Sequence, residues 1–182
     1  AVYLEMGRIP SNQREELSAT RTYDPVFGTA ATAAHIAVVD IDPETYRVKV
    51  ERFLVAEDCG KLINPMIVDG QVHGGVAQGI GAALYEEMIY NDEGQNVTAS
   101  LVDYVVPSAT EIPSIGVVHI EAASLTTLGG FRGMGEGGTI GAPAAVANAV
   151  ADALAPLGIE VFELPVTPER LFRLIENAKS NR

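Results

Sequence analysis

The spacing of apolar residues along the chain changes from period two to helical, which separates strand-like from helix-like segments. From His35 the run AHIAVVDID is rich in β-branched residues, and in YRVKVERFLVAED the apolar Val48, Val50 and Phe53 alternate with charged residues. Such alternation is typical of a strand with one buried face. The intervening DPET offers the residues of a tight turn. Residues 34–58 are therefore predicted to form a β-hairpin with one buried and one half-buried strand.

The next segment, MIVDGQVHGGVAQGIGAALYEEM, has apolar residues at helical spacing and is predicted to be a helix in spite of its glycines. Gly70 and Gly74 are four residues apart, as are Gly75 and Gly79, so each pair lies on one helix face. A glycine in a helix interior costs up to about 1 kcal/mol relative to alanine. Close approach of another backbone or of a ligand is the expected reason for these glycines.

The rest of the chain predicts shorter elements. They are a hairpin turning at residues 92–94, a strand in IGVVHIEAAS, a helix in PAAVANAVADAL with Pro143 in its first turn, a short strand in IEVFEL, and a closing helix opened by Thr167-Pro168-Glu169. The expected class is α+β, with β-hairpins and a mixed sheet packed against glycine- and alanine-rich helices. Residues 1–33 are interpreted as an N-terminal arm or loop, and residues 34–182 as one domain.

Composition narrows the classes of function. Among 182 residues, 24 are acidic and 12 are basic, a formal net charge of -12, and 47% are hydrophobic. A chain this apolar can bury a core, and its acidity argues against nucleic acid or an anionic membrane as partner. We expect no transmembrane helix, because no run of about 18 apolar residues occurs, and the first residues do not resemble a signal peptide.

The cysteine and histidine content argues against disulfides and zinc. Cys59 is the single cysteine, which excludes an internal disulfide and fits a reducing compartment, so a cytoplasmic location is expected. His35, His73 and His119 are far apart in the sequence and lack the spacing of metal ligands. No metal ligand is therefore assigned to this chain.

The most unusual local motif is a glycine-rich loop, GGFRGMGEGG, at residues 129–138, with Glu136 inside it. Glycines allow close backbone approach, so several N–H groups can face one ligand while the carboxylate projects beside it. An exposed turn carrying a solvated glutamate is an equally good interpretation of the spacing alone. Gly133, Gly135 and Gly138 formally match GxGxxG, but no buried strand precedes them, and a dinucleotide-binding Rossmann fold is rejected.

A second motif, DCGKLINP followed by GQ, gathers polar groups at a predicted strand-to-helix junction. Asn64 and Gln71 offer the paired donors and acceptors that hold heterocycles and phosphates. The structural alternative is that Asp58 and Asn64 cap turns and that Cys59 is a small buried side chain, which is favoured over a nucleophile. A hydrolase using Cys59 and His73 is a further alternative, although no motif orients that pair.

Together these blocks resemble a known family. DCGKLINPMIVDGQVHGGVAQGIGAALYEE, then the second hairpin, then GMGEGGTIGAPAAVANAVADAL are similar to the C-terminal part of the large, molybdenum-binding subunit of the xanthine dehydrogenase, aldehyde oxidase and carbon monoxide dehydrogenase family. The resemblance runs collinearly from about His35 to residue 182. Family large subunits are several times longer, so the chain is either a fragment or a piece of a split subunit, and residues 34–182 would be its C-terminal molybdopterin-binding subdomain.

The resemblance implies a role for each motif. The family's loop glutamate, matching Glu136, acts as general base when an aldehyde or N-heterocycle carbon is oxidised with water as the oxygen source. Met134 and Gly135 would line the metal centre. The residues implied to bind the dinucleotide arm of the molybdopterin cofactor are Asp58, Cys59, Gly60, Ile63, Asn64 and Gln71.

The resemblance also implies partners. They are the remainder of the molybdenum subunit, an iron–sulfur subunit and a flavin subunit carrying FAD, beside a small-molecule substrate. One cysteine cannot hold an iron–sulfur cluster, so the chain alone is expected to be inactive, and its partner-facing surface favours self-association in isolation.

Two departures from the family pattern stand out. Many members have Lys where this chain has Arg132, and Pro or Ser-Pro where it has Gly137 and Gly138. The copper-binding cysteine of carbon monoxide dehydrogenases belongs to an upstream loop, so Cys59 is not that residue.

The alternative function is a non-catalytic assembly or interaction module, a relic of the same fold. Such a relic has no need to keep Glu136, Gln71 and Asn64 together, and all three are present.

Overall fold

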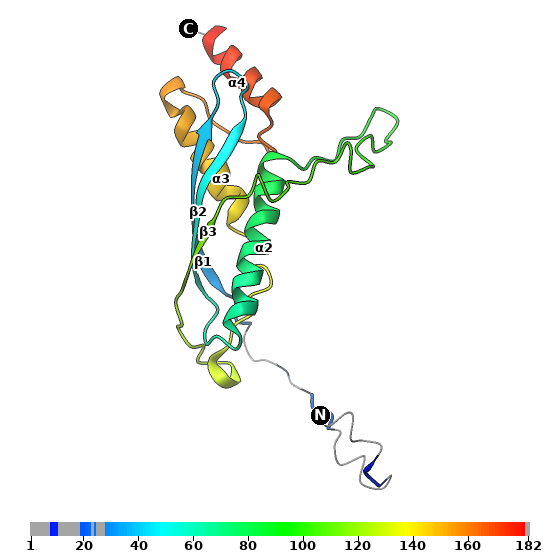
Figure 1. Ribbon diagram of the computed structural model, residues 1–182, viewed down its shortest axis with the longest axis vertical. Coiled ribbons are helices and arrows are strands. Elements are labelled where there is room, and N and C mark those ends of the chain that lie inside the picture. The colour runs from blue at the N-terminus through cyan, green and yellow to red at the C-terminus, as the bar shows by residue number, and fades with distance from the viewer. Residues whose placement is uncertain (1–7, 11–18, 23, 25–27, 181–182) are drawn as a thin grey trace.

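A long antiparallel hairpin forms the centre of the fold in the computed structural model (Figure 1). Strand β1 (Thr32–Ile41) pairs with β2 (Val48–Asp58), and the Asp42 carboxylate accepts the amide N–H of Glu44 and of Thr45 in the turn between them. The predicted hairpin is confirmed, although neither strand is wholly buried, since β2 buries alternate residues and β1 is half-buried. The structure describes residues 8–10, 19–22, 24 and 28–180.

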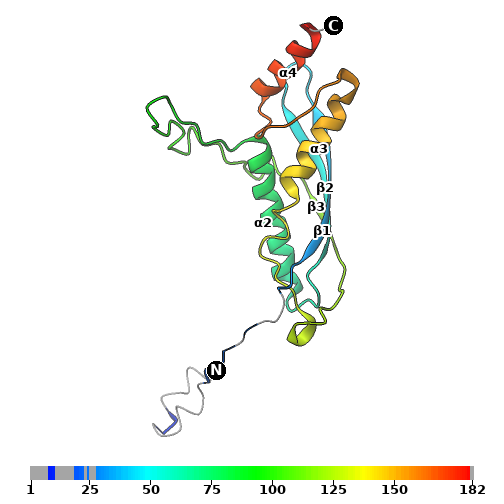
Figure 2. The same ribbon diagram turned by 180° about the vertical axis from the view of Figure 1, so that it is seen from behind.

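The third strand makes the sheet mixed. Strand β3 (Ile115–His119) runs parallel to β2, with Phe53 opposite Ile115 and Glu57 opposite His119, in the order β1-β2-β3. A parallel neighbour requires a crossover connection, and here helix α2 and a protruding segment, residues 86–113, make it. The middle of this segment extends away from the rest of the fold in both views (Figures 1 and 2), while Ile112 near its end packs against the core.

Two helices cover one face of the sheet (Figures 1 and 2). Helix α2 (Pro65–Leu84) begins after its N-cap Asn64, and helix α3 (Ala142–Leu154) has a proline in its first turn. Both lie where the glycine and alanine patterns predict. The two helices contact each other and the sheet through fully or nearly fully buried side chains, which include Phe53, Val72, Val76, Ile80, Val146, Val150 and Leu154.

The C-terminal helix is also confirmed. Helix α4 (Pro168–Ser180) follows the short 3-10 turn η4 (Ala155–Leu157) and an extended stretch. The Thr167 hydroxyl accepts the amide N–H of Arg170 at 3.3 Å, as expected for a capping threonine. Leu171 is fully buried against the rest of the core.

One predicted strand is wrong, and one predicted hairpin is shorter than a pair of strands. Residues 159–164 form no strand, because Ile159 and Val161 turn toward the core without a neighbouring strand to hydrogen-bond, while Phe162 is exposed. The predicted hairpin turn at residues 92–94 is present, and three pairings flank it: the Tyr90–Asn96 bridge and the backbone hydrogen bonds from the amide of residue 91 to the carbonyl of residue 95 and from the amide of residue 97 to the carbonyl of residue 89. No full strand forms on either side of the turn. Its flanking residues project into solvent with no sheet edge beside them.

The described residues contain no helix long and apolar enough to cross a membrane. Most of the predicted arm, residues 1–33, lies outside the described residues, so that boundary stays a prediction. Thr32 and Ala33 already belong to β1.

Candidate functional site

The two sequence motifs lie against each other although about seventy residues separate them. Gly60 pairs with Phe131 in an antiparallel bridge, and the Arg132 amide donates to the Cys59 carbonyl at 2.8 Å. Next to this bridge the Lys61 amide donates to the Gly130 carbonyl at 3.1 Å. Gly60 has a φ of +71°, and a Cβ at this position would overlap the Gly130 carbonyl oxygen. Glycine is thus required where the two loops meet.

Asp58 holds this junction from the side. One carboxylate oxygen accepts the amide N–H of Gly60 at 2.9 Å and of Ala122 at 3.1 Å. The other lies 3.6 Å from the Arg132 guanidinium, which belongs to the glycine-rich loop. The turn-capping role foreseen for Asp58 is present in the structure, and it links three segments of chain.

Cys59 is buried, with 4% of its surface exposed, and its Sγ lies 3.9 Å from a Glu57 carboxylate oxygen. Burial, and then the neighbouring charge of Glu57, raise the pKa of the thiol to about 11. The thiol is therefore protonated at neutral pH and is not an activated nucleophile. His73 is exposed on α2 and makes no contact with Cys59 among the described residues, so the hydrolase alternative has no support.

The start of α2 presents the remaining polar residues of the motif. The Asn64 side-chain oxygen accepts the Ile67 amide at 3.4 Å, which is the capping role that the sequence left open. Ile63 is 75% exposed and Gln71 is exposed, so their side chains are accessible to a ligand.

Glu136 lies at the surface of a loop whose backbone is fixed. Its carbonyl accepts the amides of Thr139 at 2.9 Å and Ile140 at 3.1 Å, while its side chain is exposed. The loop packs on α2 through Gly138, where a Cβ would lie 2.6 Å from the Val72 carbonyl oxygen. The Thr139 hydroxyl also donates to the Gly75 carbonyl at 3.2 Å. Glu136 is therefore carried on a turn anchored to the helix that bears Gln71.

The glycines of this region are of two kinds. At Gly75 a Cβ would lie 2.7 Å from the backbone of residues 138–139, so close packing requires glycine there. At Gly70 and Gly74 on α2, and at Gly133 and Gly135 in the loop, a Cβ would meet nothing within 4 Å. The packing of this chain does not explain these four. Open, bare backbone beside an exposed amide and an exposed carboxylate fits a ligand that approaches closely, and the molybdopterin group is of that kind.

Met134 differs from its neighbours in the loop. Its side chain is partly buried and packs against the hydrophobic core, with its sulfur beside Gly137. The structure thus gives Met134 a packing contact, while Gly135 is open. A role of both in lining a metal centre stays a prediction.

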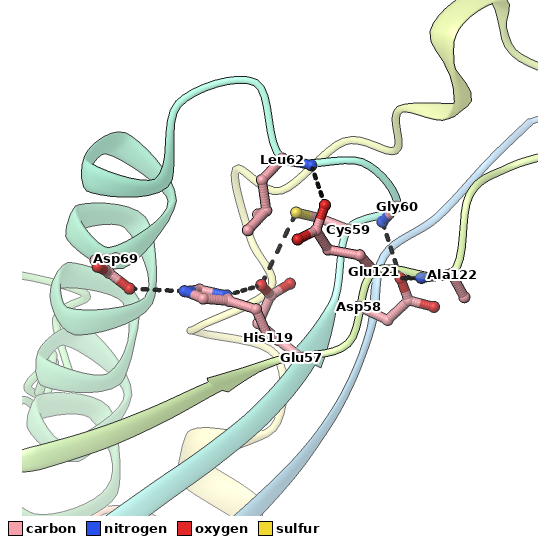
Figure 3. Close-up of polar contacts among 9 residues, drawn as sticks. All are labelled: Glu57, Asp58, Cys59, Gly60, Leu62, Asp69, His119, Glu121 and Ala122. Atoms are coloured by element: carbon pink, nitrogen blue, oxygen red, sulfur yellow. Dashed lines mark hydrogen bonds and ion pairs between the residues drawn. The ribbon is translucent and has the colours of Figure 1, made fainter.

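One cluster of titratable residues was missed by the sequence analysis. His119, at the end of β3, contacts Glu57 of β2 through Nδ1 and Asp69 of α2 through Nε2, the latter at 2.9 Å (Figure 3). Glu57 is only 1% exposed. The sequence feature that could have revealed this cluster is Glu57, an acidic residue two positions after the buried Val55 of β2, whose side chain therefore faces the same buried side of the sheet. Within the described part of the chain, no group of three or more His, Cys, Asp and Glu side chains is arranged to hold a metal ion.

His35 supports the Glu136 loop from the sheet. Its Nε2 lies 3.1 Å from the Gly137 carbonyl oxygen, and its ring packs edge-on against Phe53 with centroids 5.8 Å apart. The Nδ1 atom is buried and has no partner among the described residues. Desolvation lowers the pKa of His35 below its ordinary value of 6.5, so the ring is neutral and donates through Nε2.

This arrangement predicts an acid-sensitive loop. Because the unfolded state takes up a proton at His35 more readily than the folded state, folding stability should fall as pH drops below about 6.5. His35→Gln keeps a donor for Gly137 but cannot be protonated, so its thermal midpoint should fall less between pH 7 and pH 5 than that of the wild type. Thermal unfolding followed by circular dichroism measures this, with the exposed His73→Gln as control. Equal losses in wild type and His35→Gln would contradict the assignment.

Comparison with known proteins shows the family of this chain. A family model described as a molybdopterin cofactor-binding domain matches residues 2–113. The chain is 44% identical over 173 residues to the nicotine 6-hydroxylase large subunit of Paenarthrobacter nicotinovorans, covering 95% of this chain and 21% of that protein. It is 34% identical to the carbon monoxide dehydrogenase large chain of Hydrogenophaga pseudoflava, covering 92% of this chain and 21% of that one.

Solved structures show the same fold. Quinoline 2-oxidoreductase from Pseudomonas putida 86 matches with a TM-score of 0.77 and 51% identity, over 78% of this chain and 18% of that one. The Cu,Mo-CO dehydrogenase matches with a TM-score of 0.79 and 34% identity, over 82% of this chain and 19% of that one. The expected α+β fold is confirmed, and the chain spans about a fifth of the length of these proteins.

Proposed function

We propose that this chain forms one wall of the cofactor site of a molybdenum hydroxylase and supplies its catalytic base. The chain belongs to the molybdopterin cofactor-binding domain family. In this proposal it corresponds to the C-terminal part of the large subunit. The observation that carries the proposal is the packing of the Glu136 loop on α2 beside the exposed Gln71. It brings both family motifs to one surface with open backbone between them.

In this proposal Glu136 accepts a proton during substrate oxidation. Its carboxylate is exposed on the loop, and no hydrogen bond within the described residues occupies it. The loop itself is held by Thr139, Gly138 and His35, so the base has a fixed position. When bound, the molybdenum cofactor supplies the two-electron oxidation of the substrate carbon, with water as the source of oxygen.

The residues of the DCGKLINP motif bind or shape the cofactor site in different ways. Ile63 and Gln71 are accessible and would contact the dinucleotide arm directly. Asn64 would do so while its side-chain oxygen caps α2. Cys59 and Gly60 would contribute mainly through the backbone, since the thiol is buried.

The assembled enzyme requires more chain than this. Several matched proteins are described as large subunits or large chains, which supports an assembly of several subunits. In this proposal the partners are the rest of the molybdenum subunit, an iron–sulfur subunit and a flavin subunit, and the location is the cytoplasm. Large apolar side chains at the surface fit such contacts, among them Leu101, Val102, Leu125 and Leu128, each more than 80% exposed. The substrate proposed is an aldehyde or an N-heterocycle, oxidised at carbon.

The test is a comparison of hydrogen–deuterium exchange in the assembled enzyme with and without its cofactor, the latter from a host unable to make molybdopterin. Cofactor binding should slow exchange in residues 58–64, 70–74 and 131–138, because these amides lie on the proposed wall. Exchange in α4 should be unchanged and serves as the internal control. Equal exchange of all three segments in the two forms would refute the proposed site and would favour the relic module.

A further inference from the structure

The side chains of Glu57, His119 and Asp69 form a bridge between the sheet and the start of α2 (Figure 3). Glu57 and His119 are opposite each other in the parallel pair β2–β3, so their side chains point to the same face. Asp69 reaches the imidazole from the second turn of α2 at 2.9 Å. The exposed fraction rises from 1% at Glu57 through 22% at His119 to 48% at Asp69.

The geometry specifies the protonation state of the imidazole. Each ring nitrogen of His119 contacts a carboxylate oxygen, and a carboxylate can only accept. A neutral imidazole has a single N–H, so only the imidazolium donates to both partners. The contacts with Glu57 and then Asp69 accordingly raise the pKa of His119 above its ordinary value of 6.5, against the effect of desolvation.

No other cation contacts the buried carboxylate of Glu57 among the described residues. The Cys59 thiol donates to the same Glu57 oxygen as His119 does, and the second oxygen is buried with no hydrogen-bond partner in the part of the chain that the structure describes. The remaining acidic groups nearby have other partners: Glu121 accepts the Leu62 amide, and Asp58 accepts the Gly60 amide and pairs with the Arg132 guanidinium. The charge of His119 is therefore what compensates the buried Glu57.

The bridge joins the segments of the proposed cofactor wall. Glu57 is followed directly by Asp58, Cys59 and Gly60, which all contact the glycine-rich loop. Asp58 pairs with the Arg132 guanidinium, the Cys59 carbonyl accepts the Arg132 amide, and Gly60 forms the bridge with Phe131. Asp69 lies between Asn64 and Gln71 on α2. A rigid connection from β2 through the imidazolium to α2 thus fixes the spacing between the two halves of the DCGKLINP…GQ motif.

We propose that His119 is a positioning residue for the cofactor site, whose imidazolium holds the first turns of α2 in register with the Asp58–Gly60 turn. The proposal rests on the proposed function for its consequence, which is retention of the cofactor. Loss of the proton leaves one N–H, which stays with the buried Glu57, and releases Asp69. The contact between His119 and Asp69 is therefore present at low pH and is lost as pH rises through the raised pKa of His119.

The test uses Asp69→Asn in the assembled holoenzyme, because removing His119 itself would leave Glu57 buried without a cation and endanger folding. The amide keeps the shape of the side chain but removes its charge, which lowers the pKa of His119. Asp152→Asn, an exposed aspartate on α3, is the matched control. Hydrogen exchange of residues 64–72, corrected for its intrinsic pH dependence, and release of molybdenum measured by elemental mass spectrometry are followed from pH 6 to pH 9.

In wild type and control, exchange of residues 64–72 should accelerate about two- to fivefold as pH rises. In Asp69→Asn the acceleration should occur about half a pH unit lower, together with faster molybdenum release. Identical profiles in Asp69→Asn and Asp152→Asn would overturn the proposal, as would a shifted exchange profile with unchanged molybdenum release. Failure of the proposed function is distinguished separately, since residues 58–64 would then show no protection by the cofactor in the wild type.

Discussion

Replacing Glu136 by glutamine is expected to lower turnover of the assembled enzyme by about 10²–10⁴-fold, the range for loss of a general base. Glutamine has the same shape but does not accept a proton at neutral pH. The side chain is exposed, and the loop is held by backbone bonds and by Gly138, so the substitution should leave the local structure intact. Molybdenum content should therefore match that of the wild type.

Steady-state kinetics and elemental analysis of the same preparation check this prediction together. Glu44→Gln, in the exposed turn between β1 and β2, makes the same chemical change far along the chain and should keep full turnover. If Glu136→Gln turned over at a near-normal rate with molybdenum bound, Glu136 would have no part in the chemistry. Loss of molybdenum along with activity would instead assign Glu136 to cofactor binding.

The second large effect is expected at the helix–loop contact. Gly75→Ala should destabilise the fold by about 1–3 kcal/mol, the usual cost of forcing extra atoms into a close-packed contact. The new Cβ would lie 2.7 Å from backbone atoms of Gly138 and Thr139, and backbone on both sides leaves little room to relax. The same displacement would shift the loop that carries Glu136.

The neighbouring Gly74 provides the matched control. A Cβ at Gly74 meets nothing within 4 Å, so Gly74→Ala should leave stability unchanged or raise it by up to about 1 kcal/mol through helix propensity. Thermal unfolding of the 182-residue chain, followed by circular dichroism, compares the two variants. A Gly75→Ala midpoint equal to or above that of Gly74→Ala would show that the loop does not pack on α2 as described.

The supporting contacts of the site respond to pH in opposite directions. His35 beneath the Glu136 loop is neutral, and protonation in acid would place a charge in a partly desolvated site and so destabilise this part of the fold. His119 is charged, and its bridge to Asp69 is weakened in base. The site is therefore best ordered in a pH window between these two titrations.

Local patterns in the sequence determined most of the secondary structure. Alternation of apolar residues predicted β1 and β2, and helical spacing with capping residues predicted α2, α3 and α4, because these signals act between residues close in the chain. The strand predicted at residues 159–164 is absent, because a strand forms only where another strand offers hydrogen bonds. The motifs likewise identified the family and the loop around Glu136, although the sequence does not report how far apart these motifs lie in space.

Only the tertiary structure decided which residues meet. The bridge between Gly60 and Phe131, the packing of Gly138 on α2, and the cluster of Glu57, Asp69 and His119 each join residues more than forty positions apart. Sequence patterns report which face of an element is buried, but they do not report which neighbour covers it. Apolar residues are interchangeable partners, whereas a buried carboxylate requires one particular cation, and the fold alone brings His119 to Glu57.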